Sequence, residues 1–143
     1  MEPINLFQEP RRFTELPKTV KMAIFTLFAG WLVHFTFIYG LFQDQLTENM
    51  ILQHAGLAII SCFVLLKLKN WARILCLTGN AMVLLNYLFY LIAFATGSQG
   101  PLAVGLVLVN LSLFGASAYF LLTGDSADFF KQQSAKPPQS AAR

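Results

Sequence analysis

Four long apolar runs, separated by short polar segments, dominate the hydropathy pattern of the chain. They cover about residues 22–42, 50–67, 71–95 and 101–123. Each run is close to the roughly 20 residues that an α-helix needs to cross about 30 Å of hydrocarbon. Because lipid cannot hydrogen-bond to the backbone, such runs should be helices. The pattern predicts an all-α polytopic membrane protein, an up-down bundle of four transmembrane helices.

The overall composition agrees with this pattern. Of 143 residues, 56% are apolar and only 12% are charged, a balance that does not suit a water-soluble surface. A cleavable signal peptide is the competing interpretation of the first run. About 20 mostly polar residues precede that run, and it exceeds the 7–15 apolar residues typical of a signal peptide, so we expect a retained helix.

The distribution of Lys and Arg predicts how the chain is oriented. All ten lie before the first run, at or between the adjoining ends of the second and third runs, or after the fourth run. The other two connections, QDQLTEN and TGSQG, contain no cation. Since cytoplasmic loops carry the excess of Lys and Arg, both termini and the middle connection are expected in the cytoplasm.

The stretch VLLKLKNWARIL, between the second and third runs, is predicted to be a tight cytoplasmic hairpin that contacts lipid headgroups. Lys67 and Lys69 suit the negative end of a helix dipole and anionic lipid. Asn70 is a candidate N-cap, Trp71 suits the interface, and the Arg73 side chain can reach back to the phosphates. A basic loop that binds a ligand remains the alternative.

The two ends of the chain are expected to lie outside the hydrocarbon. Residues 1–20 mix charges with apolar side chains and contain prolines that prevent one long helix, which favours short pieces at the headgroup surface. A segment that docks a partner is the other possibility. Residues 124–132 are predicted as an interfacial turn anchored by Phe129 and Phe130, and 133–143 as a disordered tail.

Small and polar residues recur at a spacing of seven within the predicted helices. The series are Ala23 and Gly30, with His34 one turn further; His54 and Ser61; Asn80 and Tyr87; and Ala103, Asn110 and Ser117. This spacing is typical of a packing seam, where small residues let backbones approach and polar ones bond across helices. Depth counted along each helix places His34, Ser61, Asn80 and Asn110 near the midplane, and His54, Tyr87, Tyr39 and Tyr90 in the outer half.

These polar residues have two interpretations. The first is hydrogen bonding between helices, usually below about 1–2 kcal/mol each. The second is a site for a small molecule or lipid tail that opens outward, in which His34 and His54 bond a quinone or another carbonyl compound. Axial haem ligation by the two histidines is a further possibility.

Sequence motifs for catalysis or metal binding are absent. The chain has no P-loop, no H-E-x-x-H, no G-x-S-x-G, no paired carboxylates and no metal-ligand cluster. Cys62 and Cys76 do not form a C-x-x-C motif and are interpreted as packing residues. We therefore expect no enzymatic activity, cofactor, metal or nucleic-acid partner. The expected partners are the bilayer and another membrane protein or a second copy of the chain.

Three short elements carry a resemblance: LPKTVKM before the first run, KLKNWARIL after the second, and FLLTGDSADFF after the fourth. They resemble small four-helix bacterial inner-membrane proteins of unknown function, which share a K/R-N-W-A-R-x-L hairpin after the second helix. The resemblance covers about residues 17–130. It implies the fold and the location and no activity, and His34 and His54 are not part of the shared pattern.

The leading functional expectation is an accessory, structural or assembly role beside a larger membrane protein, because so little of the chain lies outside the bilayer. A small transporter or pore for a neutral or apolar solute is the alternative. A quinone- or haem-linked redox component is the third possibility.

Overall fold

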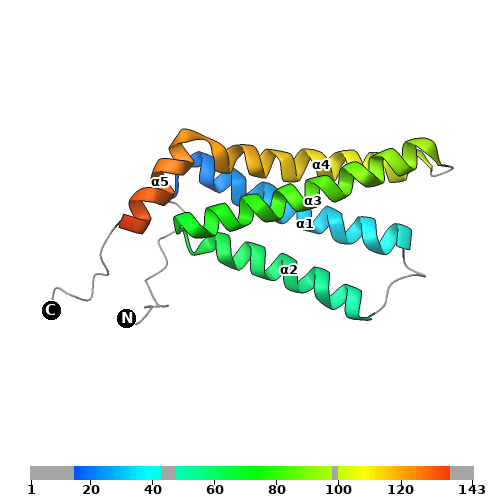
Figure 1. The fold of residues 1–143 in the computed structure, drawn as a ribbon, viewed down its shortest axis with the longest axis horizontal. Coiled ribbons are helices and arrows are strands. Elements are labelled where there is room, and N and C mark those ends of the chain that lie inside the picture. The colour runs from blue at the N-terminus through cyan, green and yellow to red at the C-terminus, as the bar shows by residue number, and fades with distance from the viewer. Residues whose placement is uncertain (1–14, 43–47, 98–99, 136–143) are drawn as a thin grey trace.

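Five α-helices account for nearly all of residues 15–42, 48–97 and 100–135, which the computed structural model describes (Figure 1). They are α1 (Lys18–Phe42), α2 (Glu48–Leu66), α3 (Asn70–Thr96), α4 (Pro101–Leu122) and α5 (Gly124–Ala135). These ranges contain no β-strand. The fold is therefore all-α, as the hydropathy pattern predicts.

The first four helices are long and apolar enough to cross a membrane. The shortest of them, α2, has 19 residues, and a rise of about 1.5 Å per residue makes it roughly 28 Å long, close to the thickness of the hydrocarbon core. The fifth helix, α5, has 12 residues and is mostly polar. The chain is a multi-pass membrane protein with four candidate spans and a short final helix.

Two helix boundaries differ from those expected. Helix α1 begins at Lys18, inside the segment expected to be interfacial, and Pro17 directly precedes it, where its carbonyl accepts a hydrogen bond from the Lys21 N–H. Helix α5 continues to Ala135, so the first residues of the expected tail are helical. The hydroxyl of Ser134 holds this end by accepting a bond from the Asn70 N–H at 2.9 Å. The remaining parts of the two expected end segments, 1–14 and 136–143, lie outside the described residues.

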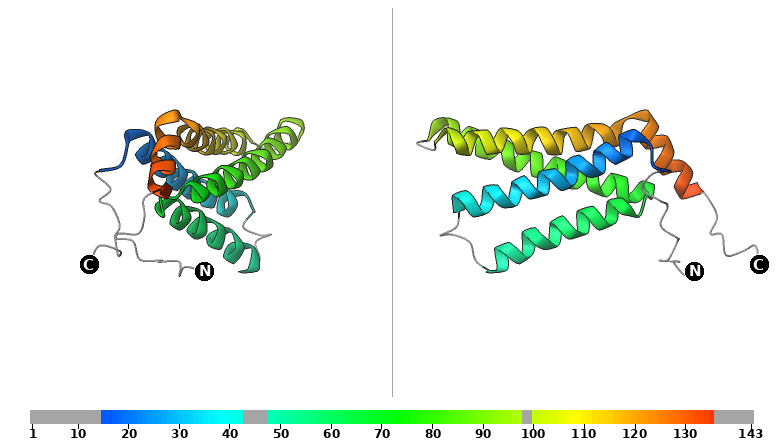
Figure 2. Two further views of the ribbon diagram at one scale, coloured as in Figure 1. Left: turned by 60° about the vertical axis from the view of Figure 1, so that its left-hand side comes forward. Right: turned by 180° about the vertical axis from the view of Figure 1, so that it is seen from behind.

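The helices run alternately up and down, and the start of α1, the turn between α2 and α3, and α5 lie at one end (Figures 1 and 2). Helices α1 and α4 pack along each other, and α3 packs on α4. Helix α2 lies at the edge and makes only limited contacts with α1 and α3. The core of the bundle is therefore formed by α1, α3 and α4.

Helices α1 and α4 approach closely where Gly30 of α1 faces Phe114 of α4. A Cβ atom at position 30 would lie 3.2 Å from the edge of the Phe114 ring, which is fully buried. The absence of a side chain at Gly30 thus lets a large aromatic ring fill the space between the two helices, in the way small residues act at membrane helix interfaces.

A second contact joins three helices through Ser117 on α4. Its hydroxyl donates to the backbone carbonyl of Ala23 on α1 at 3.1 Å and accepts from the Nδ2 of Asn80 on α3 at 3.2 Å. Ser117 has no exposed surface, and Asn80 is 3% exposed. The small and polar series of α1, α3 and α4 all face the interior, whereas His54 and Ser61 of α2 are only half-buried.

The turn between α2 and α3 is tight, but Asn70 is not the residue that caps α3. Leu68 adopts a left-handed conformation with φ of 53°, and the extended Lys69 occupies the N-cap position without a side-chain cap. Asn70 is already the first helical residue. Its backbone N–H is satisfied by Ser134 of α5, so a tertiary contact takes the place of the local cap expected from the sequence.

Candidate functional site

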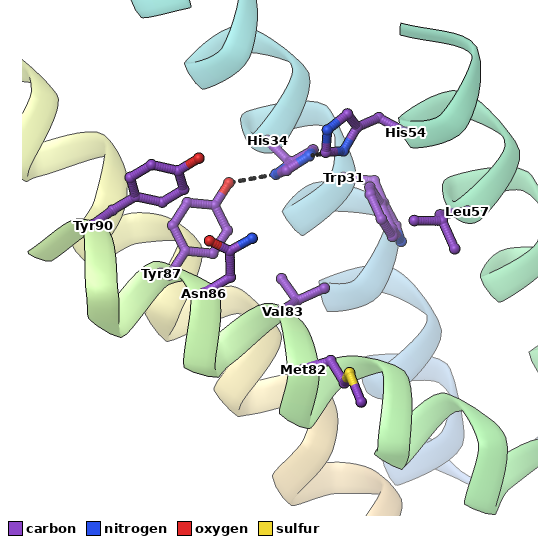
Figure 3. Close-up of a pocket in the computed structure, with 9 residues that line it drawn as sticks. All are labelled: Trp31, His34, His54, Leu57, Met82, Val83, Asn86, Tyr87 and Tyr90. Atoms are coloured by element: carbon purple, nitrogen blue, oxygen red, sulfur yellow. Dashed lines mark hydrogen bonds between the residues drawn. The ribbon is translucent and has the colours of Figure 1, made fainter. Parts of the chain in front are cut away.

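A pocket of about 250 Å³ lies between α1, α2 and α3 (Figure 3). It forms where α2 separates from the rest of the bundle. The residues that line it come from all three helices: Trp31, His34, His54, Leu57, Met82, Val83, Asn86, Tyr87 and Tyr90.

His34 is the centre of the polar part of this pocket. Its Nδ1 lies 2.5 Å from the hydroxyl of Tyr87, and its Nε2 lies 3.1 Å from the Nδ1 of His54. One residue of α1 therefore hydrogen-bonds to both α3 and α2. His34 and Tyr87 are buried, at 8% and 2% exposure, whereas His54 is half-exposed at the pocket.

The order of these bonds sets the hydrogen that each ring carries. Two orders of donation fit these contacts: Tyr87 donates to the Nδ1 of His34, whose Nε2–H donates to the Nδ1 of His54, or the Nδ1–H of His54 donates to the Nε2 of His34, whose Nδ1–H donates to Tyr87. The outer Nε2 of His54 is a donor in the first order and an acceptor in the second. In the reverse order, the hydroxyl hydrogen of Tyr87 would need another acceptor. The first order satisfies both rings of the chain and ends in one N–H donor.

Aromatic rings hold His34 in position. The Trp31 ring meets the His34 ring edge to face, with centroids 5.2 Å apart and planes at 85°. Trp31 makes a similar contact with Phe114, at 5.5 Å and 89°. Since edge-to-face pairs favour defined orientations, the histidine is fixed by packing as well as by its two hydrogen bonds.

Asn86 is a pocket residue that sequence reasoning missed. It lies in the middle of α3, its side chain is exposed on the helix surface, and it makes no hydrogen bond to the described part of the chain. Figure 3 shows its amide beside Tyr87 at the pocket. An amide within a membrane span is normally paired with another polar group. The position of this amide inside a predicted span was therefore the sequence signal for Asn86, although Asn86 lies outside the seven-residue series.

The four residues expected to share the midplane do not meet in one layer. His34 belongs to the pocket, whereas Asn80 bonds to Ser117 of α4. Ser61 donates to the carbonyl of Leu57 in its own helix, and Asn110 donates to the carbonyl of Leu106. Each of these side chains bonds to a different partner, so the four do not form one polar layer.

Residues that were expected at different depths in the membrane are also in contact. Tyr87 and His54, both expected in the outer half, bond directly to His34, which was expected nearer the midplane. Counting residues along straight helices ignores helix tilt and the reach of long side chains, and that is why the estimate separated three residues that touch.

The cationic hairpin lies at the other end of α2 from His54 and does not contribute to the pocket. The ammonium group of Lys67 lies 4.5 Å from the ring centre of Phe63, and Trp71 is 55% exposed. Lys69 and Arg73 are half-buried at the start of α3. These four side chains lie at the end of the bundle where α2 meets α3.

The polar groups of the pocket are suited to hydrogen bonding. Within the described ranges there is no group of three or more His, Cys, Asp or Glu that could hold a metal ion. The facing nitrogens of His34 and His54 are bonded to each other, so the pair does not present two open nitrogens to one iron. The cysteines, Cys62 and Cys76, are free thiols outside the pocket.

Comparison with protein-family models, with curated proteins and with solved structures finds no match to this chain.

Proposed function

We propose that this protein is an accessory or assembly subunit that associates with another membrane protein through α2. The observation that carries the proposal is the sparse packing of this helix. Only Ala58 and Leu65 of α2 are buried, whereas α4 buries Ala103, Val107, Asn110, Phe114, Ser117 and Leu121. Membrane helices are held together by close packing and interhelical hydrogen bonds, so α2 has most of its surface left for a partner.

The distribution of the described residues supports the same role. Outside the four spans, the described ranges contain the short helix α5, a tight turn and a few flanking residues. Helix α5 itself packs back on the bundle, because Phe130 is fully buried and the Ser126 hydroxyl bonds to Thr19 at 2.9 Å. Among the described residues, most of the surface open to a partner is therefore the lipid-facing side of the spans.

The proposed location is the inner membrane of a bacterium, with both termini in the cytoplasm. The location rests on the resemblance of the KLKNWARIL hairpin to small bacterial membrane proteins. The orientation is supported by the charges, since the cationic hairpin and α5 with Lys131 are at the same end of the bundle.

Photo-crosslinking from two equally exposed positions tests the partner proposal. A photoreactive residue replaces Ile59 on α2, which is 69% exposed, or Phe25 on α1, which is 67% exposed. After irradiation in intact membranes, mass spectrometry identifies the adducts. We expect a defined adduct with another membrane protein from position 59 and none from position 25.

The comparison with position 25 shows which result would contradict a partner on α2. Equal adduct patterns from positions 59 and 25, or only lipid adducts from both, would show that α2 has no special partner. An adduct consisting solely of two copies of this chain would replace the accessory role with self-association.

A further inference from the structure

We propose that the pocket between α1, α2 and α3 binds a lipid-soluble molecule through a carbonyl oxygen. The site is independent of the partner proposed for α2. Its polar groups include N–H donors without a partner among the described residues, its walls are apolar and aromatic, and it opens toward the lipid.

The pocket contains N–H groups that have no hydrogen-bond partner among the described residues. The chain from Tyr87 through His34 ends at the outer Nε2 of His54, which is a donor when Tyr87 donates to His34 and for which no partner is found in the described residues. The amide of Asn86 likewise has none there. In the same wall, the indole N–H of Trp31 is buried without a partner among the described residues. Asn86 and Trp31 thus each carry N–H groups without a partner among the described residues.

Leaving these N–H groups unpaired in a membrane is unfavourable in free energy. Hydrocarbon offers no hydrogen bond to an amide or an imidazole, so an unpaired polar group is strongly unfavourable there. An oxygen that accepts from Asn86 or His54 would remove that penalty. A carbonyl matches best, because it is an acceptor that brings no hydrogen of its own into a site already rich in donors.

The size and position of the pocket define the rest of the molecule. A volume of about 250 Å³ exceeds the roughly 150 Å³ of an engineered protein cavity that binds benzene, so one ring or one polar head with adjoining methylenes would fit. Three lining residues, Leu57, Met82 and Asn86, are exposed on the lipid-facing surface. A longer apolar tail would therefore continue from the pocket into the bilayer between α2 and α3.

Two membrane molecules share this chemistry: a quinone with an alkyl tail, and the acyl ester of a phospholipid. Each carries a carbonyl acceptor on an apolar body. The pocket recognises the carbonyl oxygen that both molecules share. The probes used in the test distinguish a quinone from a phospholipid.

Fluorescence of Trp31 gives a direct measurement, because it lines the pocket. The protein contains two tryptophans, and Trp71→Phe leaves Trp31 as the only one. The purified full chain in dodecyl maltoside, a detergent without carbonyl groups, is titrated with three quenching probes. These are decyl-substituted benzoquinone and a dibrominated phosphatidylcholine in its ester-linked and ether-linked forms.

The decisive variant is Asn86→Leu, because Asn86 has no partner in the described structure and its replacement should leave the fold intact. Its control is Gln53→Leu, which removes an exposed amide from α2 next to His54 in sequence but outside the pocket lining. His54→Leu is a second test of the donor set. Unchanged helix content and thermal unfolding qualify each variant for comparison.

We expect saturable quenching that Asn86→Leu weakens about five- to tenfold, the effect of one hydrogen bond, and that Gln53→Leu leaves unchanged. Saturation by the quinone assigns the site to a quinone-type ligand. Saturation by the ester-linked but not the ether-linked lipid assigns it to an acyl ester. Quenching that does not saturate with any probe, or that Asn86→Leu and Gln53→Leu affect equally, overturns the proposal.

Discussion

Replacement of Gly30 by alanine tests the packing of α1 against α4. The added Cβ atom would lie 3.2 Å from two atoms of the Phe114 ring and 3.3 Å from a third. Favourable contacts between carbon atoms lie at about 3.5–4.0 Å. The ring or the helix must therefore move by about 0.3 Å or more to accept a single methyl group.

The surroundings of Phe114 resist such a movement. The ring has no exposed surface, Trp31 meets it edge to face, and Tyr87 stacks on it with centroids 6.4 Å apart and planes at 26°. Overpacking of a well-packed interior typically costs about 1–3 kcal/mol. Alanine gains about 0.5–1 kcal/mol over glycine in a helix interior. The balance of these two terms predicts that Gly30→Ala lowers the free energy of unfolding by up to about 2.5 kcal/mol, with a central value of about 1 kcal/mol.

The assay is the free energy of unfolding in mixed micelles, obtained by titration with sodium dodecyl sulfate and followed by circular dichroism. Gly115→Ala on α4 is the matched control, because no atom beyond its own helix and neighbours lies within 4 Å of a Cβ there. We expect the control to be neutral or slightly stabilised. If Gly30→Ala is as stable as Gly115→Ala, the close approach of α1 and α4 is not the constraint described.

A double variant separates this clash from other effects of the alanine. Phe114→Leu removes the ring atoms that the new Cβ would meet, at the expense of some packing. In that background, Gly30→Ala should cost clearly less than in the wild type, since residues in contact do not contribute additively. Equal effects of Gly30→Ala in both backgrounds would contradict a direct contact between the two positions.

Two further predictions concern the bundle and its orientation. Ser117→Ala should lower the free energy of unfolding by about 0.6–1.7 kcal/mol, because the Ser117 hydroxyl bonds to two other helices. Ser112→Ala should have little effect, because the Ser112 hydroxyl bonds only to Leu108 in its own helix. Equal losses in the same titration would contradict the role of the three-helix contact. In a chain whose native cysteines are replaced by alanine, a membrane-impermeant maleimide should label Gly100→Cys from outside intact cells and Lys131→Cys only after the membrane is opened. The opposite labelling pattern would reverse the proposed orientation.

Much of the fold follows from the order of residues alone. Four apolar runs of nearly the length of a bilayer require helices wherever lipid excludes water, and the expected spans agree with α1 to α4 to within four residues at every boundary. The small and polar series of α1, α3 and α4 also indicate the faces that meet, because spacing along a helix fixes direction around it. The larger differences, at Lys18 and Ser134, arise where a neighbouring proline or a contact with another helix extends the helical structure.

The pairing of polar groups was decided only by the tertiary structure. His34, His54 and Tyr87 could be selected as polar residues inside the membrane, but their contact depends on the tilt and separation of three helices, which spacing along one helix does not contain. Asn86 shows the same limit: whether an amide is paired depends on what faces it from other helices. The sequence determined the number, length and inward faces of the spans. The pocket arises because α2 packs away from the core. The position of α2 is set by contacts between helices rather than by local preference.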